Sequence, residues 1–177
     1  MIDFEWEDED IPEDLGKIHI LRENGDILKF GKSHTLHEDD DNSVKYGYIN
    51  GDGEKILHRT DGPARISGYD EHWFFEGGLH REDGPAFSCK DGNFAWWFND
   101  LCHNASGPAL ILKSDSKCWY VNDMYHREDG PAVEWEFGEK EWYVCGVRHR
   151  KNGPAIERPN GNNEYWEYGV KIRSTEI

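Results

Sequence analysis

The sequence predicts an all-β fold, an elongated antiparallel sheet built from tandem β-hairpin repeats of 23 residues. The first observation is a heptapeptide that recurs along the chain; residues 126–132 read His-Arg-Glu-Asp-Gly-Pro-Ala. The histidines that begin its five copies lie 22, 23, 23 and 23 residues apart, and they are His58, His80, His103, His126 and His149. A constant period of this length is typical of repeat architectures. The second observation is that no stretch of the 177 residues has the period of an amphipathic helix, so almost no helix is expected.

Each repeat contains the same order of strand and turn signals. Gly-Pro-Ala leads into a short apolar run, then a turn, then a mostly aromatic triplet, and a second turn precedes the next histidine. The triplets are Trp73-Phe74-Phe75, Trp96-Trp97-Phe98, Trp119-Tyr120-Val121, Trp142-Tyr143-Val144 and Tyr165-Trp166-Glu167. Aromatic and β-branched runs between turns predict strands. We therefore expect one hairpin per repeat and at least ten strands, with turns at Asn50-Gly51, Gly92, Asn122-Asp123 and Gly161.

The hairpin arrangement is favoured over a coil-type β-helix by electrostatics. A hairpin repeat adds two strands to the sheet, so equivalent residues of neighbouring repeats would lie about 10 Å apart. A β-helix would stack them roughly 4.8 Å apart and place arginine on arginine and aspartate on aspartate. At the wider spacing the repeated histidines cannot share a metal ion, whose nitrogen ligands lie about 2.1 Å from it. We therefore expect each imidazole to hydrogen-bond backbone, with no metal and no cofactor.

The arginine and aspartate of the heptapeptide partly vary together. The third copy loses both, because it has Asn104 and Ser106 at these positions. This predicts an Arg–Asp pair that braces each loop. The alternative is a row of arginines that holds an anion, and the acidic residues of the same loops oppose it.

The region before the regular array is expected to differ from it. Residues 1–43 are predicted to form an acidic segment and a degenerate hairpin, and residues 44–177 one continuous domain of five and a half hairpin repeats. The first 41 residues hold 14 acidic and 4 basic side chains, a net charge of −10 out of −16. Near the N-terminus Ile2, Phe4 and Trp6 alternate with acidic residues. This pattern predicts either a strand docked on the sheet edge or an acidic-aromatic tail that binds a basic groove.

The aromatic triplets predict aromatic side chains on both faces of the sheet, because neighbouring residues of a strand point to opposite sides. Their first members would line one face and their middle members the other. Either the array folds so that both faces are covered, or one face is left open. Monomers rarely leave a large apolar stripe exposed without a use, and Tyr and Trp are preferred interface anchors.

Composition limits the partner and the compartment. The net charge of −16 argues against binding to nucleic acid or to an anionic membrane, because neutralising phosphates requires a basic surface. A basic protein is the expected partner. The chain has no apolar run long enough to span a bilayer and no signal-peptide pattern, so a cytoplasmic protein is expected. The four cysteines occupy different positions within the repeat, so we expect reduced thiols rather than a zinc or disulfide framework.

The 23-residue hairpin with its aromatic strand resembles the MORN type of repeat (membrane occupation and recognition nexus). More closely, it resembles a variant with His-Arg-x-Asp-Gly-Pro-Ala that occurs in bacteriophage and large-virus proteins. The resemblance covers about residues 44–173. Gly-Pro-Ala stands where MORN repeats have Gly-x-Gly-x-Tyr, so the lipid binding of that family is not implied.

These observations favour a non-catalytic, protein-binding repeat protein. The viral resemblance suggests a phage-encoded inhibitor that blocks a basic groove of a host defence or nucleic-acid enzyme in the host cytoplasm. The alternative is a protein that binds or sequesters a small molecule such as a nucleotide signal, by aromatic stacking and loop arginines. No catalytic residue is expected, because every loop offers the same neighbours. The candidate partner-binding residues are Phe4, Trp6, Asp8, Glu9, Asp10, Asp39, Asp40 and Asp41 in an acidic patch, and Trp97, Tyr120 and Tyr143 on the aromatic face.

Overall fold

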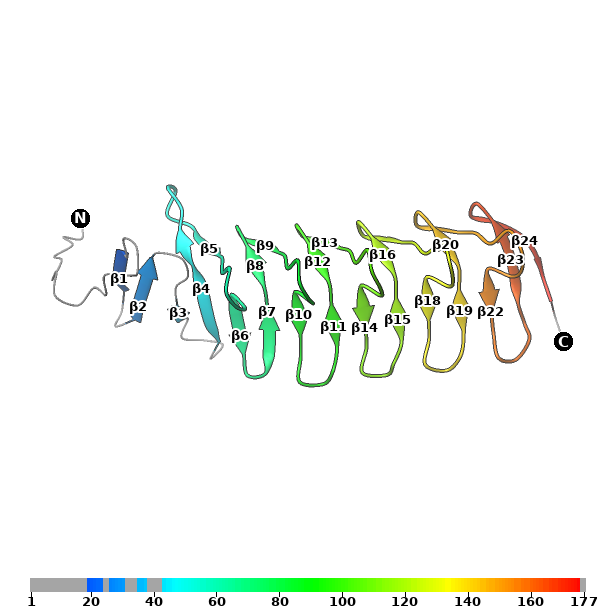
Figure 1. Ribbon diagram of the computed structural model, residues 1–177, viewed down its shortest axis with the longest axis horizontal. Coiled ribbons are helices and arrows are strands. Elements are labelled where there is room, and N and C mark those ends of the chain that lie inside the picture. Colours follow the sequence, from blue (N-terminus) through cyan, green and yellow to red (C-terminus); the bar gives the residue numbers. More distant parts are fainter. Residues whose placement is uncertain (1–18, 24–25, 31–34, 38–42, 176–177) are drawn as a thin grey trace.

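The computed structural model describes residues 19–23, 26–30, 35–37 and 43–175, the first three ranges by their backbone only. These residues form 24 strands and no helix, which confirms the prediction of an all-β protein. The strands follow one another along a single long axis, with β1 (His19–Glu23) near one end and β24 (Val170–Ser174) at the other (Figure 1). No helix in the described ranges could cross a membrane.

One antiparallel sheet of 14 strands runs the length of the molecule. Its order is β24-β23-β22-β19-β18-β15-β14-β11-β10-β7-β6-β4-β3, and β5 pairs with β4 beside this path. The strands are β3 (Thr35–His37), β4 (Val44–Ile49), β5 (Lys55–Leu57), β6 (Arg65–Ser67), β7 (Asp70–His72), β10 (Phe87–Ser88), β11 (Phe94–Ala95), β14 (Leu110–Ile111), β15 (Lys117–Cys118), β18 (Val133–Glu134), β19 (Lys140–Glu141), β22 (Ile156–Glu157), β23 (Glu164–Glu167) and β24 (Val170–Ser174). The predicted turns at Asn50-Gly51, Gly92 and Gly161 connect paired strands of this sheet.

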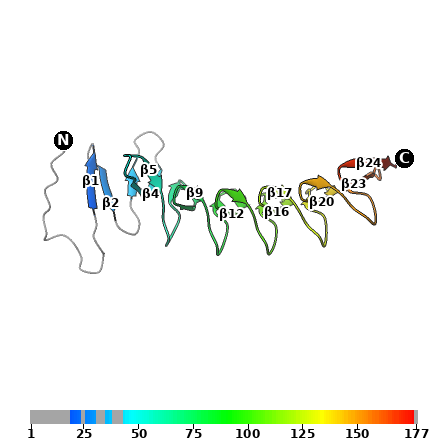
Figure 2. The same ribbon diagram turned by 90° about the horizontal axis from the view of Figure 1, so that it is seen from above.

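Each regular repeat adds a second, shorter hairpin, and here the prediction of one hairpin per repeat was wrong. These two-stranded units are β8–β9 (Phe74–Phe75 and Gly78–Leu79), β12–β13 (Trp97–Phe98 and Leu101–Cys102), β16–β17 (Tyr120–Val121 and Met124–Tyr125) and β20–β21 (Tyr143–Val144 and Val147–Arg148). A further pair, β1–β2 (His19–Glu23 and Asp26–Phe30), precedes the large sheet. The short hairpins lie on one side of the array and the connecting loops bulge on the other (Figure 2).

The first residue of each aromatic triplet is where the chain changes its pairing partner. The N–H of Trp96 donates to the carbonyl of Ala109, which leads into β14 of the long sheet, at 2.8 Å, whereas its carbonyl accepts from the N–H of His103, which follows the short hairpin β12–β13, at 3.1 Å. Trp73, Trp119 and Trp142 make the equivalent bonds. One strand of the long sheet therefore continues directly into one strand of a short hairpin.

Tight turns close the short hairpins. In the predicted turn at Asn122-Asp123, φ is 48° and 62°, which is the type I′ geometry that matches the twist of a two-residue hairpin. Asn and Asp tolerate positive φ better than most residues. Cys145 adopts a φ of 48° at the equivalent position of the next repeat, with Gly146 after it.

The core is built from small side chains. The alanine that ends each heptapeptide is 0% exposed in all five copies, and these residues are Ala64, Ala86, Ala109, Ala132 and Ala155. The alanine backbone pairs inside the sheet: the N–H of Ala109 donates to the carbonyl of Cys118 at 2.8 Å. A larger side chain would push the loop away from the strands beside it, which explains why Ala follows Gly-Pro in every repeat.

Candidate functional site

On one face of the array, the heptapeptide loops are braced by their arginines. In the fourth copy, Arg127 Nε donates to Asp129 at 2.8 Å, and Nη1 donates to the carbonyl of Pro131 at 3.2 Å. The guanidinium lies over Trp119, 4.0 Å from the ring centroid. A Cβ on Gly130 would lie 2.8 Å from Arg127 Cζ, so the loop glycine makes room for the guanidinium. The predicted Arg–Asp brace is confirmed in the first, second and fourth loops, and it includes the aromatic ring below it. In the fifth loop Arg150 pairs with Glu157 instead.

The third loop is held differently. Asn104 Nδ2 donates to the carbonyl of Pro108 at 2.9 Å, and Asn104 Oδ1 accepts from the N–H of Ser106 at 3.0 Å. One short amide therefore takes over the loop contacts of both the arginine and the aspartate. The ring of Trp96 beneath this loop gains no guanidinium from it.

Each repeated histidine bonds to the backbone of the hairpin that follows it in the chain. His126 Nδ1 accepts from the N–H of Cys145 at 3.1 Å, the first positive-φ residue of the following short hairpin. The other four pairs are His58–Glu76, His80–Asn99, His103–Asn122 and His149–Tyr168. The expected backbone hydrogen bond is confirmed, and its donor lies 18 or 19 residues further along the chain. In the parts of the chain that the structure describes, no group of three His, Cys, Asp or Glu side chains could hold a metal ion.

The opposite face carries the middle members of the triplets. All five are half-buried, and they are Phe74, Trp97, Tyr120, Tyr143 and Trp166. Both faces are therefore aromatic, as predicted. Neither row is fully covered, because the first members of the triplets are half-buried too; arginines lie over four of them, Trp73, Trp119, Trp142 and Tyr165.

Part of the second row forms a continuous stack of rings. Tyr125 lies between Tyr120 and Tyr143, with ring centroids 4.4 and 5.1 Å away. The guanidinium of Arg148 then lies 5.5 Å from Tyr143 and 5.4 Å from Trp166. We call these five residues the aromatic stack. It includes the predicted Tyr120 and Tyr143, whereas Trp97 pairs with Cys102 across its own hairpin.

Sequence reasoning missed Tyr125 and Arg148, because the position before each histidine has no repeating character. The equivalent residues of the first three copies are Leu57, Leu79 and Cys102. Only the hairpin register, which sets Tyr120 opposite Tyr125 and Tyr143 opposite Arg148, brings these side chains into the row. The signal that could have found them is that this residue lies across from the middle member of the triplet in a two-residue hairpin.

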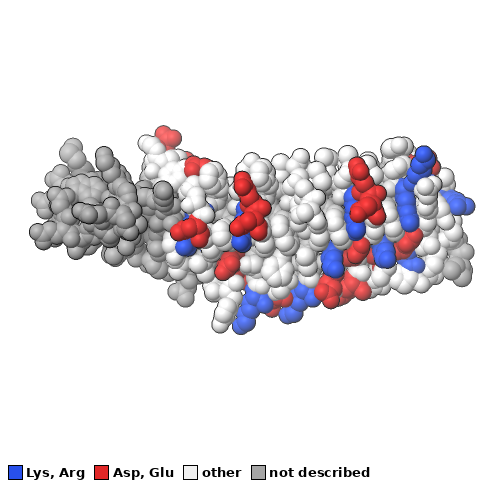
Figure 3. All heavy atoms as spheres, viewed as in Figure 1, with Lys and Arg blue, Asp and Glu red and all other residues white. Residues whose placement is uncertain are grey.

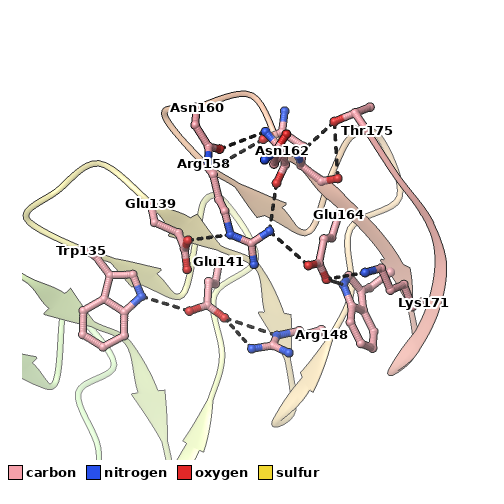
Figure 4. Close-up of polar contacts among 12 residues, drawn as sticks. Trp135, Glu139, Glu141, Arg148, Arg158, Asn160, Asn162, Glu164, Lys171 and Thr175 are labelled. Atoms are coloured by element: carbon pink, nitrogen blue, oxygen red, sulfur yellow. Dashed lines mark hydrogen bonds and ion pairs between the residues drawn. The ribbon is translucent and has the colours of Figure 1, made fainter. Parts of the chain in front are cut away.

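A buried carboxylate fixes the C-terminal half of the aromatic stack. Glu141 is 7% exposed. It accepts from Trp135 Nε1 and from Arg148 Nη2, both at 3.0 Å (Figure 4), and from the Tyr143 hydroxyl at 2.9 Å. Burial opposes its ionisation, but the hydrogen bonds from Trp135, Tyr143 and Arg148 outweigh burial and hold the pKa of the carboxyl below its usual value.

A second ionic cluster lies beside the first, at the end of the array. Glu164 accepts from Trp166 Nε1 at 2.9 Å, from Arg158 Nη1 at 3.1 Å and from Lys171 Nζ at 3.3 Å (Figure 4). Arg158 Nε also donates to Glu139 at 2.9 Å. Glu141 and Glu164 occupy equivalent positions of successive repeats, at which the two repeats before them have Ala95 and Cys118 and the first has His72. From Ala95 onwards, this position therefore changes from apolar to charged towards the C-terminus.

Two buried thiols beneath the stack, and the Tyr143 hydroxyl within it, are held in their neutral forms. Burial raises the pKa of Cys102 to about 12 and that of Cys118 to about 11. Burial, followed by the hydrogen bond to Glu141, raises the pKa of Tyr143 to about 12. Buried, protonated thiols and phenols of this kind serve packing and hydrogen bonding rather than nucleophilic attack.

The predicted acidic patch cannot be compared with the structure. Phe4, Trp6, Asp8, Glu9, Asp10, Asp39, Asp40 and Asp41 all lie outside the described residues. Comparison of the chain with protein-family models, with curated proteins and with solved structures finds no match.

Proposed function

We propose that the protein is a non-catalytic binding protein that presents the aromatic stack to a basic protein partner. In the form that its virus-type repeat suggests, the partner is a host defence or nucleic-acid enzyme whose basic groove the protein occupies. The observation that carries the proposal is the uninterrupted stack from Tyr120 to Trp166, which is half-buried and held in place from below.

The stack has the physical properties of a binding surface. Tyr and Trp supply much contact area at a small cost in side-chain entropy. The rings are held before any partner arrives, since Tyr143 and Arg148 both bond to Glu141 and Trp166 bonds to Glu164. Preorganisation reduces the entropy that binding would otherwise cost. The net charge of −16 would steer a basic partner towards the molecule.

The test uses two matched double variants as capture reagents. Tyr120→Ser/Tyr143→Ser changes the stack, whereas the control Phe75→Ser/Phe98→Ser changes two aromatic residues that are 46% and 44% exposed. We expect the wild type and the control to retain one basic host protein, and the stack variant to lose it although it still folds. Affinity for that protein should fall as salt rises. Equal capture by all three forms, or a salt-independent affinity, would contradict the proposal.

One observation favours the small-molecule alternative. A groove of about 640 Å³ lies between the first two heptapeptide loops, and its lining includes Arg59, Trp73, Phe75, His80 and Arg81. This volume is typical of small-molecule sites. Both arginines are already paired with an aspartate, so the groove suits a planar ligand better than a phosphate. Native mass spectrometry of the purified protein would detect a ligand retained there.

A further inference from the structure

The row of covered rings on the loop face has one gap. Each of five aromatic residues has a guanidinium 3.7 to 4.1 Å from its ring centroid, and these pairs are Tyr46–Arg59, Trp73–Arg81, Trp119–Arg127, Trp142–Arg150 and Tyr165–Arg173. Trp96 belongs to the same row. Within residues 43–175 it is the member over which no arginine or lysine lies.

The space above Trp96 has room for a guanidinium group. In the four loops with an arginine, a Cβ on the loop glycine would lie 2.6, 2.9, 2.8 and 3.1 Å from the guanidinium carbon, at Gly62, Gly84, Gly130 and Gly153. In the third loop, the nearest atom to a Cβ on Gly107 would be Asn104 Nδ2, at 3.7 Å. The short amide therefore braces the loop without filling the volume above the ring.

The loops on both sides of the gap are acidic. Glu82 and Asp83 precede it, with side chains 81% and 80% exposed, and Glu128 and Asp129 follow it at 88% and 83%. The third loop itself has no charged residue between His103 and Pro108. Figure 3 shows an uncharged patch in the middle of this face, with acidic and basic side chains clustered on each side of it. A cation above Trp96 would thus be placed between two carboxylate-bearing loops.

We propose that the gap above Trp96 binds an arginine side chain of a basic protein partner. The molecule itself shows the geometry, because five of its own arginines stack on the equivalent rings. Arginine is the expected cation rather than lysine, because its planar guanidinium stacks on an aromatic ring and is less strongly hydrated. The inference goes beyond the proposed function: the site lies on the face opposite the aromatic stack and stands if the stack has no partner.

The repeat architecture allows the gap to be closed and to be moved. Asn104→Arg/Ser106→Asp restores the usual heptapeptide and places an internal guanidinium over Trp96. Arg127→Asn/Asp129→Ser should open an equivalent gap over Trp119. Each double variant leaves the net charge of the protein unchanged, so general electrostatic attraction is matched in all three forms.

The probes are fluorescein-labelled hexa-arginine and hexalysine, with binding followed by anisotropy and by NMR of the indole N–H groups. The Trp96 signal is identified as the one lost in Trp96→Phe. We expect the wild type to prefer hexa-arginine and the Trp96 signal to shift. Closing the gap should weaken hexa-arginine binding about fivefold to tenfold, the size of a partly desolvated cation–π contact. Opening the second gap should add a shift of a second indole signal.

Three results would overturn the proposal. One is equal affinity of the wild type and the closed-gap variant for hexa-arginine, and another is a Trp96 signal that stays in place while the peptide binds. The third is the absence of hexa-arginine binding to the wild type at low salt. The closed-gap variant gains a loop brace, so its melting temperature should equal or exceed that of the wild type. The comparison therefore holds even if the opened-gap variant fails to fold.

Discussion

Replacing Glu141 with alanine should be among the most destabilising single changes on the face of the aromatic stack. Three donors lose their acceptor: the Trp135 indole, the Tyr143 hydroxyl and the Arg148 guanidinium. A partly buried donor left without a partner costs about 1 kcal/mol or more, so we expect a loss of about 3 kcal/mol in the free energy of unfolding. For a chain of this length, that corresponds to a melting temperature lower by roughly 6 to 12 °C.

The control is Glu136→Ala, which removes the same charge from an exposed position in the neighbouring turn. Thermal unfolding followed by circular dichroism, with urea titration beside it, measures both variants. If Glu141→Ala melts within 1 or 2 °C of the control, the reasoning from buried donors is refuted.

The preceding repeat suggests a variant that distinguishes two quantities. One is the stability lost when only one partner of the Glu141–Arg148 ion pair is removed, and the other is the stability that the intact pair contributes. Its equivalents of Glu141 and Arg148 are Cys118 and Tyr125. Replacing a buried ion pair by well-packed residues is often nearly neutral, whereas removing one partner is not. The double variant Glu141→Cys/Arg148→Tyr should therefore retain more stability than Glu141→Ala. A double variant as unstable as Glu141→Ala would contradict this and show that the Glu141 carboxylate stabilises the fold more than well-packed residues can.

The lowered pKa of Glu141 predicts that the protein loses stability in acid. The pKa of Glu141 in the folded protein lies below the ordinary value of 4.5, so its stabilising contribution is fully present above about pH 4.5. The contribution is lost as the pH falls through the lower folded-state pKa. The stability difference between the wild type and Glu141→Gln should thus stay constant from pH 7 to 5 and shrink below 4.5. A difference that shrinks already between pH 7 and 6 would contradict this.

Three further predictions concern other parts of the array. Gly130→Ala should lower the melting temperature because a Cβ would displace the guanidinium 2.8 Å away, whereas Gly107→Ala should be neutral or stabilising; equal effects would contradict the role given to the loop glycine. Burial, and then Arg65, lower the pKa of His72 below 6.5, so stability should fall as the pH drops below 6.5, and His72→Phe should flatten that slope in urea titrations. Iodoacetamide at pH 8 should modify exposed Cys145 before the two buried thiols beneath the aromatic stack, as peptide mass spectrometry would show.

The sequence by itself determined the local features of this protein. The spacing from His80 to His149 specified a repeat, and the Asn122-Asp123 pair specified a tight turn, because both depend only on residues close together in the chain. The brace between Arg127 and Asp129 was also predictable, since the two residues lie in one loop and both are lost together in the third copy.

Only the tertiary structure decided how the repeats share their contacts. The aromatic triplet is predicted as one strand, yet Trp96 bonds through its N–H to Ala109 beside the long sheet and through its carbonyl to His103 beside a short hairpin, and no local signal distinguishes these partners. Tyr125 and Arg148 entered the aromatic stack through cross-strand register, and Glu141 became a buried acceptor because Trp135, Tyr143 and Arg148 converge on it. Such contacts depend on which side chains the strands bring together, and the residues of one repeat do not reveal which residues of another repeat they will contact.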